Sequence, residues 1–203
     1  GMPNRPIIND PEFIDDADYL IIESTYGDSI HEGSGKSTQK LVEIINKTAL
    51  RGGTVMIPSI AVGRTQELVY ELNMYYEYNE DIEEYMKIPI YVDSPMAVQA
   101  TEAFQANSSS FNEEAKNLIL KGDNPFLFTN LRYIKSQEES MALNKYEFPK
   151  VIISSSGMAT AGRIRHHLKH NLWDEKNSLV FVGYQAEGTL GRIILNGAKN
   201  VKI

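Results

Sequence analysis

The stretch that decides the fold reads Thr54-Val55-Met56-Ile57-Pro58-Ser59-Ile60-Ala61-Val62-Gly63-Arg64-Thr65-Gln66-Glu67. It joins a short, partly β-branched apolar run to a loop of small residues, and a helical pattern follows in which Leu68, Leu72 and Tyr75 share one face. Comparable strand-length runs recur at 19–22, 90–92, 131–134, 151–153 and 179–182. Apolar runs separated by helical patterns predict a mainly parallel sheet that is buried on both faces. The predicted fold class is therefore α/β, a doubly wound, Rossmann-like sheet sandwiched by helices.

Composition limits the classes of protein to which the chain can belong. Its 203 residues are 42% apolar and 23% charged, as expected for one soluble domain or a domain with a fragment of a second. It has no cysteine, which excludes disulfides, iron-sulfur clusters and thiol nucleophiles and fits a reducing cytoplasm. No apolar run approaches the ~20 residues of a membrane span. We therefore expect a cytoplasmic protein that neither enters a membrane nor is secreted.

Charge is unevenly distributed along the chain. Twenty Lys and Arg against 27 Asp and Glu give a net charge of -7, which argues against a general polyanion binder. Residues 151–203 carry seven basic and three acidic side chains, or +4, so the remainder carries -11. Part of that acid lies between 77 and 84, where a solvated connection is the simplest interpretation.

Two strings are similar to ligand-binding motifs but do not satisfy them. The segment 32–38 ends like a phosphate-binding P-loop, yet the position of the first glycine holds Ile30, so a glycine-rich turn leading to a helix cap is the better interpretation. His166 and His170 are four residues apart, but no carboxylate stands at the helical spacing that a third zinc ligand would need. We therefore predict neither a P-loop ATPase nor a metal site in this chain. On a helix, His166 and His170 share a polar stripe with Arg163, opposite the apolar stripe of Ile164, Leu168 and Leu172.

Four loops that follow predicted strands end in helix starts rich in glycine and small residues. They are 58–67, 93–97, 154–163 and 183–192. In parallel sheets, ligands approach the carboxyl ends of the strands. Backbone N–H groups at such helix starts bind anions, and Arg64, Arg163 and Arg192 supply positive charge. Taken alone, each loop also has only the glycine and small residues that any tight strand-to-helix turn requires.

Taken in order, the loop sequences carry a family resemblance. The strings are Glu23-Ser24-Thr25-Tyr26-Gly27-Asp28, Ile57-Pro58 with Gly63-Arg64-Thr65-Gln66-Glu67, Tyr91-Val92-Asp93-Ser94-Pro95-Met96-Ala97, Ser155-Ser156-Gly157-Met158 with Gly162-Arg163, and Val182-Gly183-Tyr184-Gln185. Their ordered series resembles the β-CASP region of RNA-processing metallo-β-lactamase-fold nucleases, in the branch of the polyadenylation endonuclease and its bacterial and archaeal relatives. The resemblance covers almost the entire chain.

The resemblance implies that the chain is one part of a two-zinc, metal-dependent ribonuclease that hydrolyses RNA between a metallo-β-lactamase domain and the β-CASP domain inserted into it. Residues 1–27 would be a strand and linker of the metallo-β-lactamase part, and 28–203 the β-CASP domain. Glu23 matches the motif A acid, which would orient a histidine outside this chain. The His-x-His-x-Asp-His metal motif does not occur here, so the chain alone is expected to hold no zinc and to be inactive.

By the same resemblance, the β-CASP part would hold the RNA. The predicted RNA-binding residues are Arg64, Ser94, Ser155, Ser156, Gly157 and Arg163, with Tyr184 as a weaker candidate for stacking on a base. The expected partners are RNA, the metallo-β-lactamase domain of the same protein and a second copy in a homodimer. A different class stays open: a free-standing α/β module that binds a mononucleotide or a small phosphorylated ligand without chemistry.

Overall fold

A parallel sheet forms the centre of the molecule. The computed structural model describes residues 5–28, 34–79 and 87–203, and among these five strands pair in the order β3-β2-β4-β1-β5, all parallel. The strands are β1 (Thr54–Pro58), β2 (Ile90–Val92), β3 (Leu131–Tyr133), β4 (Lys150–Ser154) and β5 (Ser178–Leu179). β1 to β4 coincide with predicted apolar runs, which confirms those four predictions, whereas β5 shares only Leu179 with the run predicted at 179–182.

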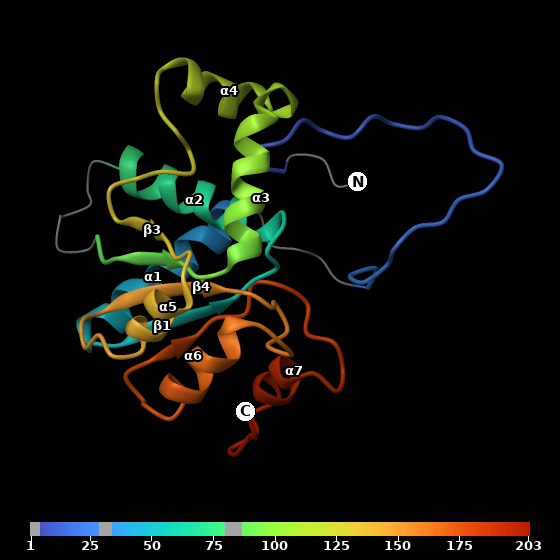
Figure 1. Ribbon diagram of the computed structural model, residues 1–203. Helices are drawn as coiled ribbons and strands as arrows, with labels where there is room; N and C mark the ends of the chain where they lie inside the picture. The colour runs from blue at the N-terminus through green and yellow to red at the C-terminus, as the bar shows by residue number, and fades with distance from the viewer. Residues whose placement is uncertain (1–4, 29–33, 80–86) are drawn as a thin grey trace.

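Helices cover both faces of this sheet (Figure 1). α1 to α4 pack on one face, and α5 to α7 pack on the other. Their bounds are α1 (Ser34–Leu50), α2 (Arg64–Tyr78), α3 (Pro95–Ala106), α4 (Glu113–Leu120), α5 (Gln137–Leu143), α6 (Arg163–Asn171) and α7 (Leu190–Leu195), with a short 3-10 helix at Ser108–Ser110. This is the doubly wound α/β arrangement that the sequence predicts.

The side chains of the central strands alternate between two cores. On β1, Val55 and Ile57 point into the larger core with α1 and α2, whereas Met56 points into the smaller core with Ile164 and Leu168 of α6. All five side chains are at most 1% exposed. Fully burying one such side chain stabilises the fold by about 1.5–3 kcal/mol. The apolar stripe predicted for residues 164, 168 and 172 is confirmed, since Leu172 also packs there.

The N-terminal arm, residues 5–28, differs from the prediction. Ile7 is buried in the larger core, and Ile8 forms an antiparallel bridge with Phe111, which anchors the start of the arm. Beyond this anchor the arm leaves the body (Figure 1), and the run 19–22, expected to be a strand, forms none and is 74–99% exposed. The strand prediction is wrong here because an isolated strand has no ladder partner in which to pair its backbone groups.

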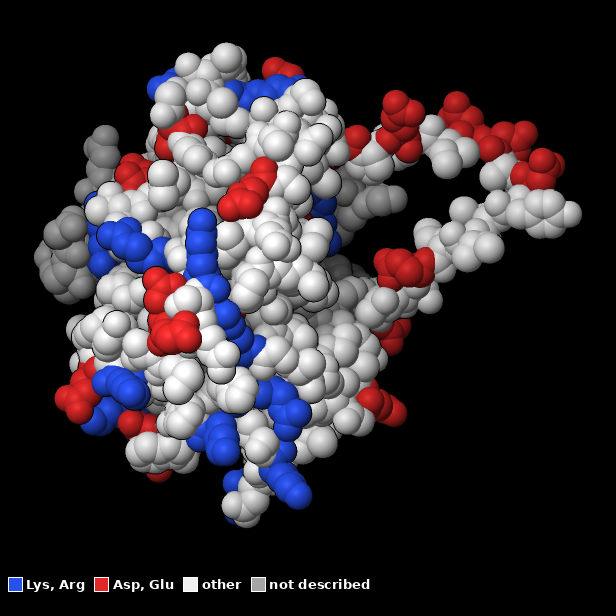
Figure 2. Space-filling view, in the orientation of Figure 1, with Lys and Arg blue, Asp and Glu red and all other residues white. Residues whose placement is uncertain are grey.

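The arm carries mainly acidic side chains, whereas acidic and basic side chains are interspersed over much of the body (Figure 2). Acidic residues line the arm, and Lys and Arg gather over α7 and the C-terminal end, in agreement with the positive last quarter of the sequence. The acidic positions 80–84 lie outside the described residues. Within the described ranges, no helix has both the length and the apolar character that crossing a membrane requires.

Candidate functional site

Three of the predicted loops meet at the carboxyl edge of the sheet. β4 lies between β2 and β1, so the loops that follow these strands are neighbours. The Ser59 amide donates to the Ser154 carbonyl (3.0 Å), and the Asp93 amide donates to the Ile153 carbonyl (2.8 Å). Gly157 approaches so closely that a Cβ there would lie 3.2 Å from the Ile60 nitrogen. This edge is therefore continuous across β2, β4 and β1.

Two hydroxyls predicted to contact RNA face each other at this edge. The Ser94 and Ser155 Oγ atoms are 2.8 Å apart and share a hydrogen bond. Ser94 is also the N-cap of α3, where its Oγ accepts from the Ala97 amide at 3.2 Å. Its side chain is thereby fixed, with only 2% of the residue exposed.

The rest of the loop after β4 is held by its own atoms. The Ser156 Oγ accepts from the amides of Thr160 and Ala161, each at 3.2 Å. The Gly157 carbonyl accepts from the Gln185 Nε2 at 3.0 Å, which ties this loop to the one after β5. Gly162 has a φ of 79°, which favours glycine, and begins α6. Ser156 therefore stabilises the turn that presents Ser155.

Asp93 organises the charges beneath these hydroxyls. Its side chain is fully buried, and it accepts from Arg163 Nη1 (2.7 Å), His167 Nε2 (2.6 Å) and Ser140 Oγ (2.5 Å). Burial raises the pKa of Asp93, but the hydrogen bonds from His167, Ser140 and Arg163 outweigh it and leave the pKa below its ordinary value. Asp93 is thus a carboxylate at neutral pH. Arg163, whose side chain is 21% exposed, also donates to the Lys135 carbonyl at 3.4 Å.

The other predicted residues lie toward β5 and the arm. Arg64 donates to the Val182 carbonyl (3.2 Å) and pairs with Glu67 (3.0 Å), so it is tied to the loop after β5. Glu23 is exposed, and its carboxylate accepts from the Thr25 amide at 2.9 Å, a bond that lowers its pKa. The structure thus joins Ser94 to Ser155 directly and ties Arg163 to the same edge through Asp93, the residue before Ser94, whereas Arg64 and Glu23 have other partners.

Tyr184 makes an aromatic contact with the arm. Its ring lies edge-on to that of Tyr26, with 5.9 Å between centroids. Because Tyr26 belongs to the turn that follows Glu23, this contact places the Glu23 turn beside the loop after β5.

Comparisons with known proteins agree with this architecture. A family model described as the Beta-Casp domain matches residues 65–194. The chain belongs to the β-CASP family.

Curated relatives of this β-CASP chain carry names from RNA metabolism. Ribonuclease TTHA0252 of Thermus thermophilus is 39% identical over all of the chain and 46% of its own length. Transcription termination factor FttA of Methanocaldococcus jannaschii is 40% identical over 91% of the chain and 28% of its own length. Endoribonuclease YSH1 of Candida glabrata is 33% identical over 88% of the chain and 23% of its own length. The chain thus spans less than half the length of these relatives, whose names do not favour the small-ligand alternative.

One residue of the β-CASP site, His167, was not predicted from the sequence. His166 and His170, assigned to a stripe with Arg163, are exposed, and the histidine that faces inward is His167. The inward polar stripe of α6 is Arg163, His167 and Asn171, at intervals of four residues. The spacing of four residues between these polar side chains is the sequence signal that indicates this stripe.

The backbone amides at three helix starts of the β-CASP body donate to groups of the chain itself, whereas such amides were predicted to bind an anion. The Gly63 amide donates to Gln66 Oε1 (2.7 Å), and the Ile164 amide donates to the Ser155 carbonyl (3.2 Å). The Arg192 amide is capped by Thr189 Oγ1 at 3.2 Å, and its guanidinium donates to the Gln185 carbonyl at 3.1 Å. These internal partners stabilise the loops, and the amides concerned are not free to bind an anion.

The described β-CASP residues do not fit a zinc ion. Among residues 5–28, 34–79 and 87–203, no three His, Cys, Asp or Glu side chains converge. Asp93 and His167 are adjacent, but the carboxylate already binds three donors and both imidazole nitrogens have partners. No chemical step is therefore assigned to a metal within this chain.

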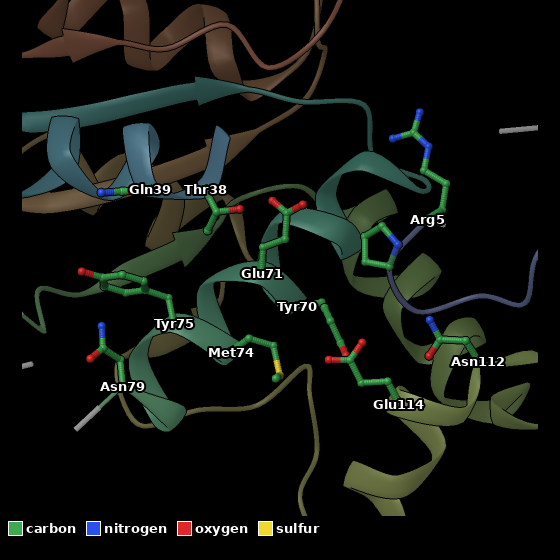
Figure 3. A pocket seen from close by; sticks show the side chains of 11 residues that line it. Arg5, Thr38, Gln39, Tyr70, Glu71, Met74, Tyr75, Asn79, Asn112 and Glu114 are labelled. Atoms are coloured by element: carbon green, nitrogen blue, oxygen red, sulfur yellow. The ribbon is translucent and has the colours of Figure 1, made fainter. Parts of the chain in front are cut away.

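A cavity of about 830 Å³ lies elsewhere, between the start of the arm, α1 and the second half of α2 (Figure 3). Among the described residues that line it are Arg5, Thr38, Glu71 and Glu114, and none of these lining residues is a predicted site residue. Burial raises the pKa of Glu71, against the lowering effects of Arg64 and Thr38. The cavity is separate from the carboxyl edge, because α2 begins at that edge and the lining begins one and a half turns further along.

Proposed function

We propose that the chain is the substrate-holding β-CASP module of a metal-dependent ribonuclease that hydrolyses RNA phosphodiester bonds. The supporting names are those of Ribonuclease TTHA0252, which aligns with every residue of the chain, and Endoribonuclease YSH1. The observation that carries the proposal is geometric: two serine hydroxyls and a fixed arginine stand together at the carboxyl edge of a parallel sheet. Such an edge is where open α/β sheets bind their ligands.

In this proposal, Arg163 and the Ser155 hydroxyl receive phosphate oxygens of the RNA strand, and the buried Ser94 hydroxyl holds that of Ser155 in place. A guanidinium presents donors in a planar fork that matches phosphate, and hydroxyls add donors that rotate to suit. Asp93 holds Arg163 in place from below at 2.7 Å. Ser156 and Gly157 shape the loop that carries Ser155, and Arg64 extends the same wall toward β5.

The remainder of the reaction belongs to other parts of the full-length protein. Metal ions, two zinc ions in our proposal, would be held by residues outside this chain and would activate the attacking water. Glu23 would orient a histidine of the metallo-β-lactamase domain, to which we assign residues 1–27. Pairing into a homodimer and a cytoplasmic location stay predictions.

The proposal is tested by RNA binding to the full-length protein at several salt concentrations. We expect Arg163→Ala to weaken binding and to reduce the slope of log affinity against log salt by about one, the value for one lost phosphate contact. Arg165→Ala, which removes an exposed arginine two residues further along α6, is the matched control. Equal affinity and slope for wild type and Arg163→Ala would contradict the assignment.

A further inference from the structure

His167 lies in a closed polar cage formed by α5, α6 and the end of β2. Its side chain has no exposure to solvent. The ring Nε2 is 2.6 Å from Asp93 Oδ2, and the ring Nδ1 is 2.9 Å from Asn144 Oδ1. The protonation state of the imidazole therefore follows from what these two partners can donate or accept.

The orientation of the Asn144 amide is fixed by a chain of hydrogen bonds. The Asn171 Nδ2 lies 2.8 Å from the backbone carbonyl of His167 and 3.0 Å from Asn144 Oδ1. A carbonyl oxygen can only accept, so the NH₂ group of Asn171 must face it. The same NH₂ group then donates to Asn144, which must present its oxygen to both neighbours. Because Asn144 presents an oxygen, Nδ1 of His167 has to carry a proton.

The opposite side of the ring leads to the same requirement. Asp93 Oδ2 accepts from Ser140 Oγ, and Oδ1 accepts from Arg163 Nη1 at 2.7 Å, which are contacts of an ionised carboxylate. The pKa of Asp93 is lowered despite its burial, because His167, Ser140 and Arg163 all donate to it. Nε2 of His167 therefore also faces an acceptor and carries a proton.

We propose that His167 is a positioning residue held as a buried imidazolium, whose charge keeps Arg163 from being neutralised by Asp93 and so keeps the RNA-binding edge positive. With Asp93 at -1 and Arg163 and His167 at +1 each, the cluster carries +1. With a neutral His167 it would carry zero. This inference rests on the proposed function, since it gives Arg163 its charge toward phosphate.

Few other charges act on this cluster. Glu139 of α5, which is exposed and caps its own helix start, acts on Arg163, and the pKa of Glu139 is lowered mainly by the amides of Ser136 and Lys135. Toward the sheet, the neighbours of α6 are apolar residues of the smaller core such as Met56. The charge on the His167 imidazole therefore decides whether the cluster is positive or neutral.

The protonation state is measured directly by NMR of the full-length protein labelled with ¹⁵N-histidine. His167 is assigned as the ring whose signals disappear in His167→Gln. We expect two protonated ring nitrogens for His167 at neutral pH, each with a directly bonded hydrogen that exchanges slowly because the ring is enclosed. A ring with one protonated nitrogen at neutral pH would overturn the proposal, and this result requires no variant to bind RNA.

The functional consequence is measured by the RNA affinity of variants of the full-length protein at neutral pH and low salt. We expect His167→Gln, checked for folding by thermal unfolding, to bind about threefold to tenfold more weakly, the effect of one partly screened charge. His166→Gln, an exposed neighbour, is the control and should keep the wild-type affinity.

The outcomes separate this inference from the function on which it rests. If Arg163→Ala weakens RNA binding but His167→Gln binds RNA as tightly as the wild type, the role of His167 is wrong and the RNA site stands. If Arg163→Ala has no effect on RNA binding, the proposed function fails, and a role for His167 in that function fails with it.

Discussion

Asp93 accepts hydrogen bonds from a serine, an arginine and a histidine although its side chain has no contact with solvent. Loss of the carboxylate would leave the Arg163 guanidinium without its buried partner, and the donors of Ser140 and His167 without an acceptor. Breaking a buried ion pair by removing one partner costs about 3–5 kcal/mol, more than most single substitutions.

We therefore expect Asp93→Asn to lower the free energy of unfolding by about 3–5 kcal/mol, measured from urea unfolding curves. Glu102→Gln, an exposed carboxylate on α3, is the control and should stay within about 0.5 kcal/mol of wild type. A loss below about 1 kcal/mol for Asp93→Asn would show that the network is not a source of stability.

The same residue gives stability a defined pH dependence. Because the folded-state pKa of Asp93 lies below its unfolded value, its contribution is complete above the unfolded value of about 4 and is lost as the pH falls through the lowered value. The difference in unfolding free energy between wild type and Asp93→Asn should therefore shrink on acidification below about pH 4. A difference that stays constant down to pH 2 would contradict this.

At the residue scale, the sequence predicted part of the site. Ser94 and Arg163 were found because each stands where a strand passes into a helix. His167 was missed, although a helix advances about 100° per residue, which puts His167 between Arg163 and the buried Ile164 and puts His166 on the far side. Its partners, on α5 and after β2, lie far away in the sequence, and only the folded chain brings them together.

Among the elements, the turn before α6 depends on a glycine for two reasons. Gly162 has a φ of +79°, and a Cβ there would lie 2.2 Å from the Ser155 carbonyl oxygen. Gly122 has a similar φ of +83° but no atom within 4 Å of a Cβ, so it isolates the backbone contribution.

We expect Gly122→Ala to cost about 1–2 kcal/mol of stability through its backbone alone. Gly162→Ala should cost about 1–3 kcal/mol more, because the loop must move away from Ser155. It should also weaken RNA binding of the full-length protein, which Gly122→Ala should not. Chemical unfolding and RNA titration of both variants measure this, and equal losses would refute a steric role for the turn.

Strands were predictable where the fold supplies them with neighbours. The runs at 54–57, 90–92 and 151–153 became β1, β2 and β4 because each is covered on both faces and paired at its edges. The run 19–22 has the same local pattern and stays unpaired. Local sequence therefore reports a capacity to form a strand, and a neighbouring strand decides whether that capacity is realised.

For the molecule as a whole, the arm and the body have opposite character. The arm exposes Phe13, Ile14 and the run 19–22 to solvent, between acidic residues, while the body has its own closed cores.

We expect the isolated 203-residue chain to show no RNA hydrolysis with added zinc, because the described residues do not fit a metal ion. The full-length protein should cleave the same RNA.

Cleavage is measured on a labelled RNA, with the full-length protein and the isolated chain prepared in parallel. Activity of the isolated chain that survives further purification and disappears with Glu23→Ala would contradict this prediction. The sequence could predict the sheet and its edge, but it could not predict the course of the arm, since its apolar run 19–22 pairs with no strand among the described residues.

The position of β4 between β1 and β2 has a consequence for how the protein is made. Neither β1 nor β2 can complete its pairing until the strand between them, some 60 residues after β2, has been synthesised. At a synthesis rate of about 5–20 residues per second, the edges of β1 and β2 that face β4 stay unpaired for several seconds. The edge that carries Ser155 and Arg163 can therefore be completed only after β4 has been inserted between β1 and β2.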